Sequence, residues 1–187
     1  NDPAGWTVGV TAGRVLRANV ENDFSVSSGL SGQKSNWLLA GQVIFADRFT
    51  FMGRALTDDD LELTSGEFQA AYSDDRLSLV TGYIHTGADL AENRLVPISE
   101  FGLASSYDFT PSWSGRLSGI YDFESERATT AALGLTFRNE CLLVNLSLSR
   151  RFTSSTSVTP TTDFGLGVEL LGFGGGSSPG PARQCRG

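Results

Sequence analysis

Residues that carry reaction chemistry are scarce in this chain. Its 187 residues include one histidine, His85, and two cysteines, Cys141 and Cys185. A zinc site built from Cys and His alone would fall short of four ligands unless carboxylates helped, and the cysteines do not form a C-x-x-C motif. Asp89 and Glu92 lie near His85 in the sequence, but no catalytic signature surrounds them. We therefore expect no enzyme activity, no catalytic residue, no metal site and no cofactor.

Basic residues and long apolar runs are also missing. Lys34 is the single lysine among 14 basic residues, and 21 acidic residues bring the net charge to −7. This balance argues against a nucleic-acid binder, because neutralising phosphates requires clustered Lys and Arg. No segment approaches the roughly 20 apolar residues of a transmembrane helix, and no basic and apolar leader opens the sequence. We expect either a cytosolic chain or one whose N-terminus is missing. The acidic run Asp58–Asp60 could hold a divalent cation, although a solvated turn is the simpler interpretation.

The dominant pattern along the chain has a period of two. Apolar residues do not accumulate at the helical spacing of 3.6, whereas alternation of apolar and polar residues is widespread. In 141–152, for example, Leu142, Val144, Leu146 and Leu148 alternate with polar residues. The pattern predicts strands at 6–20, 36–46, 48–56, 61–73, 76–86, 98–109, 112–123, 128–138, 141–152 and 163–173.

The connections between these strands predict their arrangement. Short polar turns near 46–48, 73–76, 110–112 and 138–140 mostly alternate with longer connections at 21–34, 57–60, 87–95 and 152–161, and the link at 124–127 is short. Strands so close in sequence must be antiparallel neighbours, because a parallel crossover needs a dozen or more residues. The sequence therefore predicts an up-and-down meander.

The composition of the two strand faces favours a membrane over a soluble core. A soluble β-sandwich also alternates, and alternation alone leaves that possibility open. However, the opposing face is rich in Gly, Ser, Thr, Asn and Arg, and the segments have the length of tilted membrane-spanning strands. The apolar face also carries aromatic residues near strand ends, as expected at membrane interfaces: Trp6, Trp37, Phe49, Phe109, Trp113, Phe123, Phe137, Phe152, Phe164 and Phe173. We predict an all-β fold, an antiparallel up-and-down transmembrane β-barrel.

A resemblance to a known family sharpens this prediction. The last strand, from Asp163 through Phe164, Gly165, Gly167, Val168 and Leu170 to Phe173, looks like the C-terminal signal of outer-membrane barrels. Residues 139–141, 149–156 and 160–165 resemble the C-terminal end of the LPS-assembly family LptD, in its alphaproteobacterial form. Segments 13–17 and 28–32 also look like this family's barrel. The resemblance implies that about ten strands form the C-terminal portion of a larger barrel over 1–173, followed by a flexible periplasmic Gly/Ser/Pro tail at 174–187.

The same resemblance implies transport of lipopolysaccharide (LPS) into the outer leaflet of the outer membrane of a Gram-negative bacterium. Its implied partners are LPS, an LptE-type plug lipoprotein, a periplasmic LPS bridge reached through a missing N-terminal domain, the barrel assembly machinery and the lipid bilayer. Strand 163–173 would be one lip of a lateral gate, where Pro160 would weaken pairing and Gly165 and Gly167 would remove side chains from the lumen side. Simple strand-end chemistry and close packing explain these residues as well.

Topology counted back from a final strand that runs to the periplasm puts the short turns there and the longer loops outside. Arg150 and Arg151 would then lead into an outer loop, where they could meet LPS phosphates or anchor the strand. Cys141 and Cys185 would both be periplasmic, where oxidation is expected. The family's disulfides join the end of the barrel to its periplasmic domain, so Cys141 could bond Cys185 or a cysteine elsewhere, or both could be free.

Two other functions stay open from the sequence. One is a different outer-membrane barrel, such as a closed ten-stranded one of the porin or omptin kind, which would need strands 6–20 and 163–173 to pair. The other is a soluble all-β binding module, which would need the apolar residues of 163–173 to pack against a second sheet.

Overall fold

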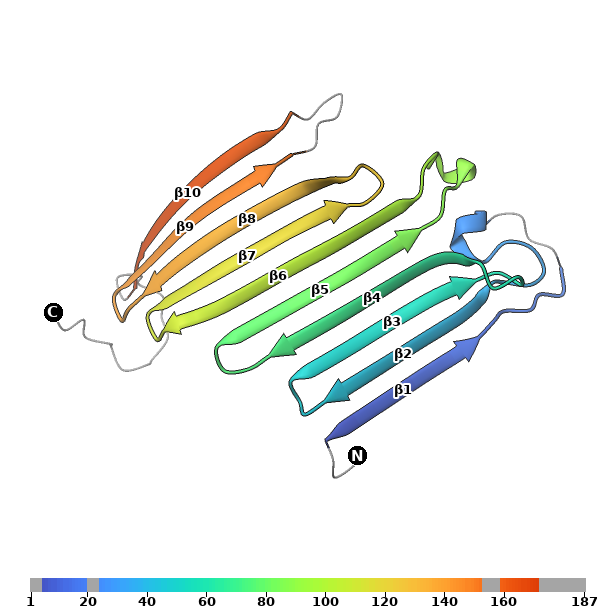
Figure 1. Ribbon diagram of the computed structural model, residues 1–187, viewed down its shortest axis with the longest axis horizontal. Helices are drawn as coiled ribbons and strands as arrows, with labels where there is room; N and C mark the ends of the chain where they lie inside the picture. The colour runs from blue at the N-terminus through green and yellow to red at the C-terminus, as the bar shows by residue number, and fades with distance from the viewer. Residues whose placement is uncertain (1–4, 20–23, 153–158, 172–187) are drawn as a thin grey trace, which may run out of the picture.

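The computed structural model describes residues 5–19, 24–152 and 159–171. Ten strands form one sheet in the order β1 to β10, and every neighbouring pair is antiparallel (Figure 1). The strands are β1 (Trp6–Gly13), β2 (Trp37–Phe45), β3 (Phe49–Thr57), β4 (Leu63–Ser73), β5 (Leu77–Thr86), β6 (Ile98–Thr110), β7 (Trp113–Asp122), β8 (Arg127–Arg138), β9 (Leu142–Arg151) and β10 (Thr161–Leu170). The prediction of an all-β up-and-down meander is confirmed.

Two strand boundaries differ from the predicted ones. The first strand ends at Gly13 rather than near residue 20, because the chain leaves the ladder at Arg14 and pairs with the other limb of the same connection through an isolated bridge between Leu16 and Lys34. The last strand begins at Thr161, directly after Pro160, and ends at Leu170. Phe173 and the predicted tail at 174–187 lie outside the described residues, so the division into barrel and tail stays a prediction.

The sheet is a single curved layer whose first and last strands lie at opposite sides (Figure 1). In the described part of the chain, β1 pairs with β2 alone and β10 with β9 alone. The seam that a closed ten-stranded barrel would need is therefore not formed. Two short 3-10 turns, η1 (Val26–Ser28) and η2 (Leu90–Glu92), lie in the connections. None of the described helical turns has the length and apolar character needed to cross a membrane.

The hairpins at one end of the sheet are short and locally stabilised. We call this the short-turn end, formed by 46–48, 74–76, 111–112 and 139–141. The Asp74 carboxylate accepts the backbone N–H groups of Arg76 and Leu77 at 2.8 and 2.7 Å, and these bonds hold its pKa at about 2. Asn139 Oδ1 accepts the N–H of Leu142 at 2.7 Å in the same way. Asx side chains of this kind mimic a backbone turn, which explains tight reversals where the sequence has no Asn-Gly pair.

The connections at the opposite end differ in length and structure. We call this the long-loop end, formed by the described residues of the connections 14–36, 58–62, 87–97, 123–126 and 152–160. The hairpin register aligns the two ends across all ten strands, so each strand runs between one short turn and one longer connection, apart from the ends of β1 and β10.

Candidate functional site

One face of the sheet, the apolar face, carries most of the large apolar residues and receives such residues from all ten strands. The pairings Val8 with Val43 and Leu146 with Leu166 show the alignment, which continues from strand to strand. Its central members are Val8, Val43, Phe51, Phe68, Leu103, Leu117, Leu133, Leu146 and Leu166. Large apolar side chains on this face are exposed, with Val10 at 80% and Phe164 at 79% relative exposure. No apolar residue in the described ranges is buried.

This exposure identifies the environment that the sheet requires. Monomeric soluble proteins rarely expose a contiguous apolar patch beyond a few hundred Å². The soluble-module alternative needs a second sheet over the apolar face, but the described strands all belong to one sheet. An apolar environment such as lipid would cover the face without a second layer, because the strands satisfy their own backbone hydrogen bonds.

Aromatic rings form a band along the apolar face at the short-turn end. Trp6 and Phe45 have ring centroids 4.4 Å apart, and Phe49 and Tyr72 lie 4.7 Å apart. Further along the sheet, the Phe109 ring lies against the apolar face of Gly115, where an added Cβ would come within 2.8 Å of it. A β-bulge between Asp108 and Thr110 accompanies this placement of Phe109. Trp and Tyr bands at this position are typical of strands that cross a membrane interface.

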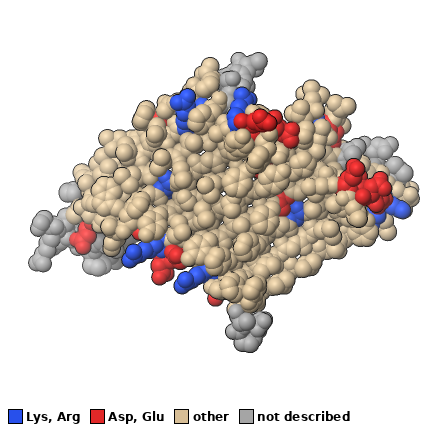
Figure 2. All heavy atoms as spheres, viewed as in Figure 1, with Lys and Arg blue, Asp and Glu red and all other residues tan. Residues whose placement is uncertain are grey.

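A second set of aromatic residues lies at the long-loop end. Phe123 contacts Tyr121 with centroids 5.1 Å apart, and the Arg14 guanidinium lies 5.0 Å from the centroid of the Trp37 ring. The charged residues follow the same division. Figure 2 shows that Lys, Arg, Asp and Glu on the viewed side gather towards the two ends of the strands, with few across the middle. Aromatic residues at both borders of the apolar face match the profile of a bilayer.

The opposite face, the polar face, changes character along the sheet. From β2 to β5 it includes aliphatic residues such as Met52, Val80 and Ile84, whereas from β8 to β10 it carries Gly, Ala, Ser, Thr, Asn and charged residues. A hollow of about 570 Å³ lies over the first part, lined by polar-face residues that include Gln42, Met52 and Ile84. It also contains the ion pair between Arg54 and Glu67, whose Nε and Oε1 are 2.8 Å apart.

The predicted gate residues lie on both faces of β10. Phe164, Val168 and Leu170 belong to the apolar face, where they align with β9 residues of the same kind. Asp163, Gly165 and Gly167 belong to the polar face. A Cβ on Gly165 would meet the Ser147 hydroxyl of β9, which would have to turn aside, whereas the Ser147 Cβ is 3.8 Å away. The far edge of β10 is unpaired in the described residues, and Pro160 stands exposed just before the strand.

The arginine pair divides between the two faces as the alternation predicts. Arg150 lies on the apolar side with its guanidinium 5.1 Å from the centroid of the Phe152 ring. Arg151 lies on the polar side and pairs with Thr161 of β10. At the short-turn end, Cys141 is disulfide-bonded. Cys185 lies outside the described residues, so the predicted pairing stays a prediction.

The structure brings the two upstream segments that resemble the LptD barrel into contact. Residues 13–17 and 28–32 belong to the same connection, between β1 and β2. Arg17 donates to the carbonyl oxygens of Leu30 and Gly32 at 2.6 and 3.2 Å. Arg14 donates to the Ser35 carbonyl at 2.8 Å. The connection is therefore folded on itself rather than an extension of β1.

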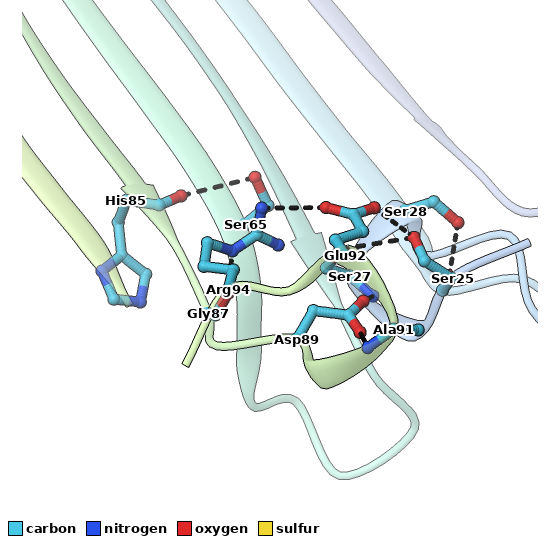
Figure 3. A network of polar contacts seen from close by, with 10 residues as sticks. All are labelled: Ser25, Ser27, Ser28, Ser65, His85, Gly87, Asp89, Ala91, Glu92 and Arg94. Atoms are coloured by element: carbon cyan, nitrogen blue, oxygen red, sulfur yellow. Dashed lines mark hydrogen bonds and ion pairs between the residues drawn. The ribbon is translucent and has the colours of Figure 1, made fainter. Parts of the chain in front are cut away.

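A polar junction between two connections at the long-loop end was not predicted (Figure 3). The buried Asp89 carboxylate, 7% exposed as a residue, accepts the backbone N–H of Ser27 at 2.8 Å and that of Ala91 at 2.9 Å. Glu92 accepts a short hydrogen bond from the Ser25 hydroxyl. These bonds lower the pKa of both carboxyl groups, with the Ser27 and Ser25 bonds the largest causes. Asp89 and Glu92 thus serve as acceptors for loop donors rather than as companions of His85.

The acidic run is likewise committed to loop contacts. Asp58 Oδ1 accepts the backbone N–H groups of Asp60 and Glu62 at 3.0 and 2.8 Å. Asp59 forms an ion pair with Arg14 at 2.7 Å, and this contact is the main cause of its lowered pKa. No group of three potential metal ligands occurs in the part of the chain that the structure describes. The simpler interpretation, a solvated turn, fits this geometry.

Comparison with known proteins gives one family. A family model described as "LptD: LPS transport system D" matches residues 2–113. No curated protein matches the chain. The match covers the first part of the chain, from β1 to the start of β7, whereas the resemblance quoted from the sequence was most specific at 139–173, outside the matched range.

Proposed function

The chain belongs to the LptD family of LPS transport proteins, and from this we propose that it forms the C-terminal portion of an outer-membrane translocon barrel that inserts LPS into the outer leaflet. At the family level the role is LPS transport at the outer membrane of Gram-negative bacteria, and not enzymatic catalysis. The observation that carries the proposal is the apolar face, which extends across ten strands and is not covered by any second layer in the described residues. The proposed environment of that face is the bilayer.

The proposed topology puts the short-turn end in the periplasm and the long-loop end outside. Outer-membrane barrels have short periplasmic turns and longer outer loops, and the ten strands alternate between connections of these two kinds. The C-terminal signal of β10, from Asp163 to Phe173, would then be presented to the barrel assembly machinery from the periplasmic side.

The unpaired edge of β10 supports a role as one lip of a lateral gate. Such a gate requires an edge that is held weakly enough to part from its neighbour. Pro160 offers no N–H to a ladder, and Gly165 and Gly167 present no side chain on the polar face. Inside a lipid bilayer, the unpaired backbone groups at a sheet edge need hydrogen-bond partners from the protein. In the complete barrel another strand would therefore pair with β10 in the closed state.

Partners are proposed for the polar face and for the outer border. The hollow with its aliphatic lining and the Arg54–Glu67 pair would receive the plug lipoprotein of the LptE type. Arg150 and Arg151 would meet the phosphates of LPS as it leaves the gate, because guanidinium groups bind phosphate bidentately. The periplasmic LPS bridge would act through a further domain.

Site-specific photo-crosslinking in cells that export LPS tests this function. A photoreactive residue replaces Phe164 of β10 in the natural gene, and a matched one replaces Val43 on the apolar face of β2. We expect LPS adducts at position 164 and few at position 43, because only β10 borders the proposed gate. Adducts that are equal at both positions, or absent from both while the variants support growth, would contradict the gate.

The closed ten-stranded barrel is the second candidate. It would require β1 and β10 to pair with each other, and the described residues show no such pairing. An engineered disulfide between these two strands that formed in cells without loss of LPS export would favour it.

A further inference from the structure

Among the described residues, those with the lowest exposure lie in loops or near the ends of strands, and not in the middle of strands. Five polar residues and one glycine are buried in the described ranges: Ser27, Ser35, Thr57, Asp89, Ser99 and Gly29. All of them lie at the long-loop end, in or next to the connections 14–36, 58–62 and 87–97. Burial of a carboxylate is unfavourable unless hydrogen bonds compensate for lost water. Such a cluster therefore indicates a specific packed arrangement.

The first connection is tied to the third. Asp89 accepts the backbone N–H of Ser27, 62 residues away in the chain, and Glu92 accepts from the Ser25 hydroxyl. Arg94 forms an ion pair with the carboxylate of Glu92, with its Nη1 2.8 Å from Oε2. Its Nε also donates to the Gly87 carbonyl at 2.8 Å. Figure 3 shows these side chains converging between the two connections. Strands β3 and β4 lie between the hairpins that carry them, so the contact spans the end of a neighbouring hairpin.

The first connection is also tied to the second. Arg14, whose side chain is only 15% exposed, holds Asp59 at 2.7 Å. Asn36 donates from Nδ2 to the Thr64 hydroxyl at 2.7 Å, at the start of β4. The connection 14–36 therefore contacts both other loops, and it links the hairpins β1–β2, β3–β4 and β5–β6.

The connection between β7 and β8 behaves differently. The Asp122 carboxylate accepts the N–H groups of Glu124 and Ser125 and the Ser125 hydroxyl, so these contacts stay within one hairpin. The first six strands thus carry polar side-chain contacts that skip neighbours. The β7–β8 connection instead meets β6 through the ladder and the bond from the Phe123 N–H to the Ser99 carbonyl, and it meets β5 through the contact of the Phe123 and Tyr83 rings.

We propose that the described residues of connections 14–36, 58–62 and 87–97 form a clamp, which holds the ends of β1–β6 at the long-loop end together as one cooperative block. In this clamp, Asp89 and Glu92 bind 14–36 to 87–97, and Arg14 binds it to 58–62. Loosening either contact loosens all three connections, while the β7–β8 hairpin responds on its own. The clamp does not depend on the proposed export function, since it is defined by contacts within the chain.

Hydrogen exchange on the complete folded protein in lipid vesicles tests the clamp. Asp89→Asn keeps the size of the side chain but removes its charge and replaces one carboxylate oxygen with an NH2 group. Because that group cannot accept a hydrogen bond, the Ser27 and Ala91 amides no longer both have an acceptor. We expect at least tenfold faster exchange in 24–36 and in 87–95, with a smaller increase in 58–62. The matched control is Asp122→Asn, for which faster exchange is expected in 122–127 alone.

Two outcomes would overturn the clamp. Exchange in Asp89→Asn that rises only within 87–95 would show that the loops are independent, and unchanged exchange throughout would show that the junction does not hold them. If Asp89→Asn fails to fold, Ser25→Ala removes the exposed hydroxyl that donates to Glu92 and leaves the backbone bonds intact. Faster exchange in both 24–36 and 87–95 is expected for that variant as well, and a change confined to 24–28 would again contradict the proposal.

Discussion

The sheet and the loop clamp are stabilised in opposite ways. The sheet buries no apolar residue in its described strands. The contacts that stabilise it are the hydrogen bonds between strands and the aromatic contacts at its two borders. The clamp at 14–36, 58–62 and 87–97 instead has buried serines and a buried carboxylate, each with hydrogen-bond partners. The difference shows which environment each region is adapted to: the sheet depends on an apolar surrounding, whereas the clamp makes its own polar interior.

A charge on the apolar face is expected to have the largest effect. Leu133 of β8 is 57% exposed and lies between Leu117 and Leu148, in the middle of that face. Leu133→Arg should reduce the free energy of unfolding in lipid vesicles by about 2–4 kcal/mol, the cost of Arg near a bilayer midplane. Urea titration measures this.

The adjacent residue provides the control for that prediction. Ala132 points to the polar face, between Ser118 and Ser149. Ala132→Arg should change stability little, because the charge remains in a wet interior. Equal effects of the two substitutions would show that the two faces do not have different surroundings and would contradict the membrane assignment of the apolar face.

The aromatic band is expected to be next in sensitivity. Gly115 lies under the Phe109 ring, and an added Cβ would come within 2.8 Å of the ring carbon. Gly115→Val should displace the ring and cost about 1–3 kcal/mol, the usual range for overpacking. Gly102→Val serves as the control, because nothing lies within 4 Å of an added Cβ there. Chemical denaturation in vesicles compares them, and a larger effect of Gly102→Val would count against packing of Phe109 on Gly115.

Acid is expected to have the smallest effect, and in the clamp it acts on Asp89 and Glu92. The pKa values of Asp89 and Glu92 are lowered in the folded protein, mainly by bonds from Ser27 and Ser25. Depressed pKa values mean that the carboxylates stabilise the clamp above their unfolded values of about 3.9 and 4.3, and that this contribution is lost as pH falls through the folded values. The positive charge of Arg94 faces Glu92 and acts in the same direction.

Hydrogen exchange at a series of pH values, corrected for the intrinsic rate, measures this loss. Protection of 24–36 and 87–95 should stay constant from neutral pH to about 5 and fall below about 4, while the strand amides of β2–β5 stay protected. Loss of loop protection between pH 6 and 7 would contradict the assignment of these carboxylates to the clamp.

Much of the sheet could be predicted from residue types alone. In β9, for example, Val144, Leu146 and Leu148 alternate with Asn145, Ser147 and Ser149, and a period of two admits one assignment of faces. Short polar turns such as the one at Asn139 indicated where the chain reverses. The end of β1 was less predictable, because Val15 and Leu16 continue the apolar character of the strand although Arg14 and Arg17 bind the opposite limb of the connection.

The clamp could not be predicted in this way. Ser27 and Asp89 are 62 residues apart, and neither lies in a periodic segment or a recognised motif. In the sequence, the one feature noted for Asp89 and Glu92 is that they lie near His85. In the structure their hydrogen bonds go to Ser25, Ser27 and Ala91. The only available signal was a Ser-rich connection opposite an acidic one, which many solvated loops share.

The sequence by itself determined the ten strands, their antiparallel order and the identity of the two faces, because alternation and short turns act between close neighbours in the chain. Tertiary structure decided which loops meet and which carboxylates become buried, because those contacts depend on how the curved sheet brings the ends of separate hairpins together. It also left β1 and β10 as separate edges, a feature that local pattern does not specify.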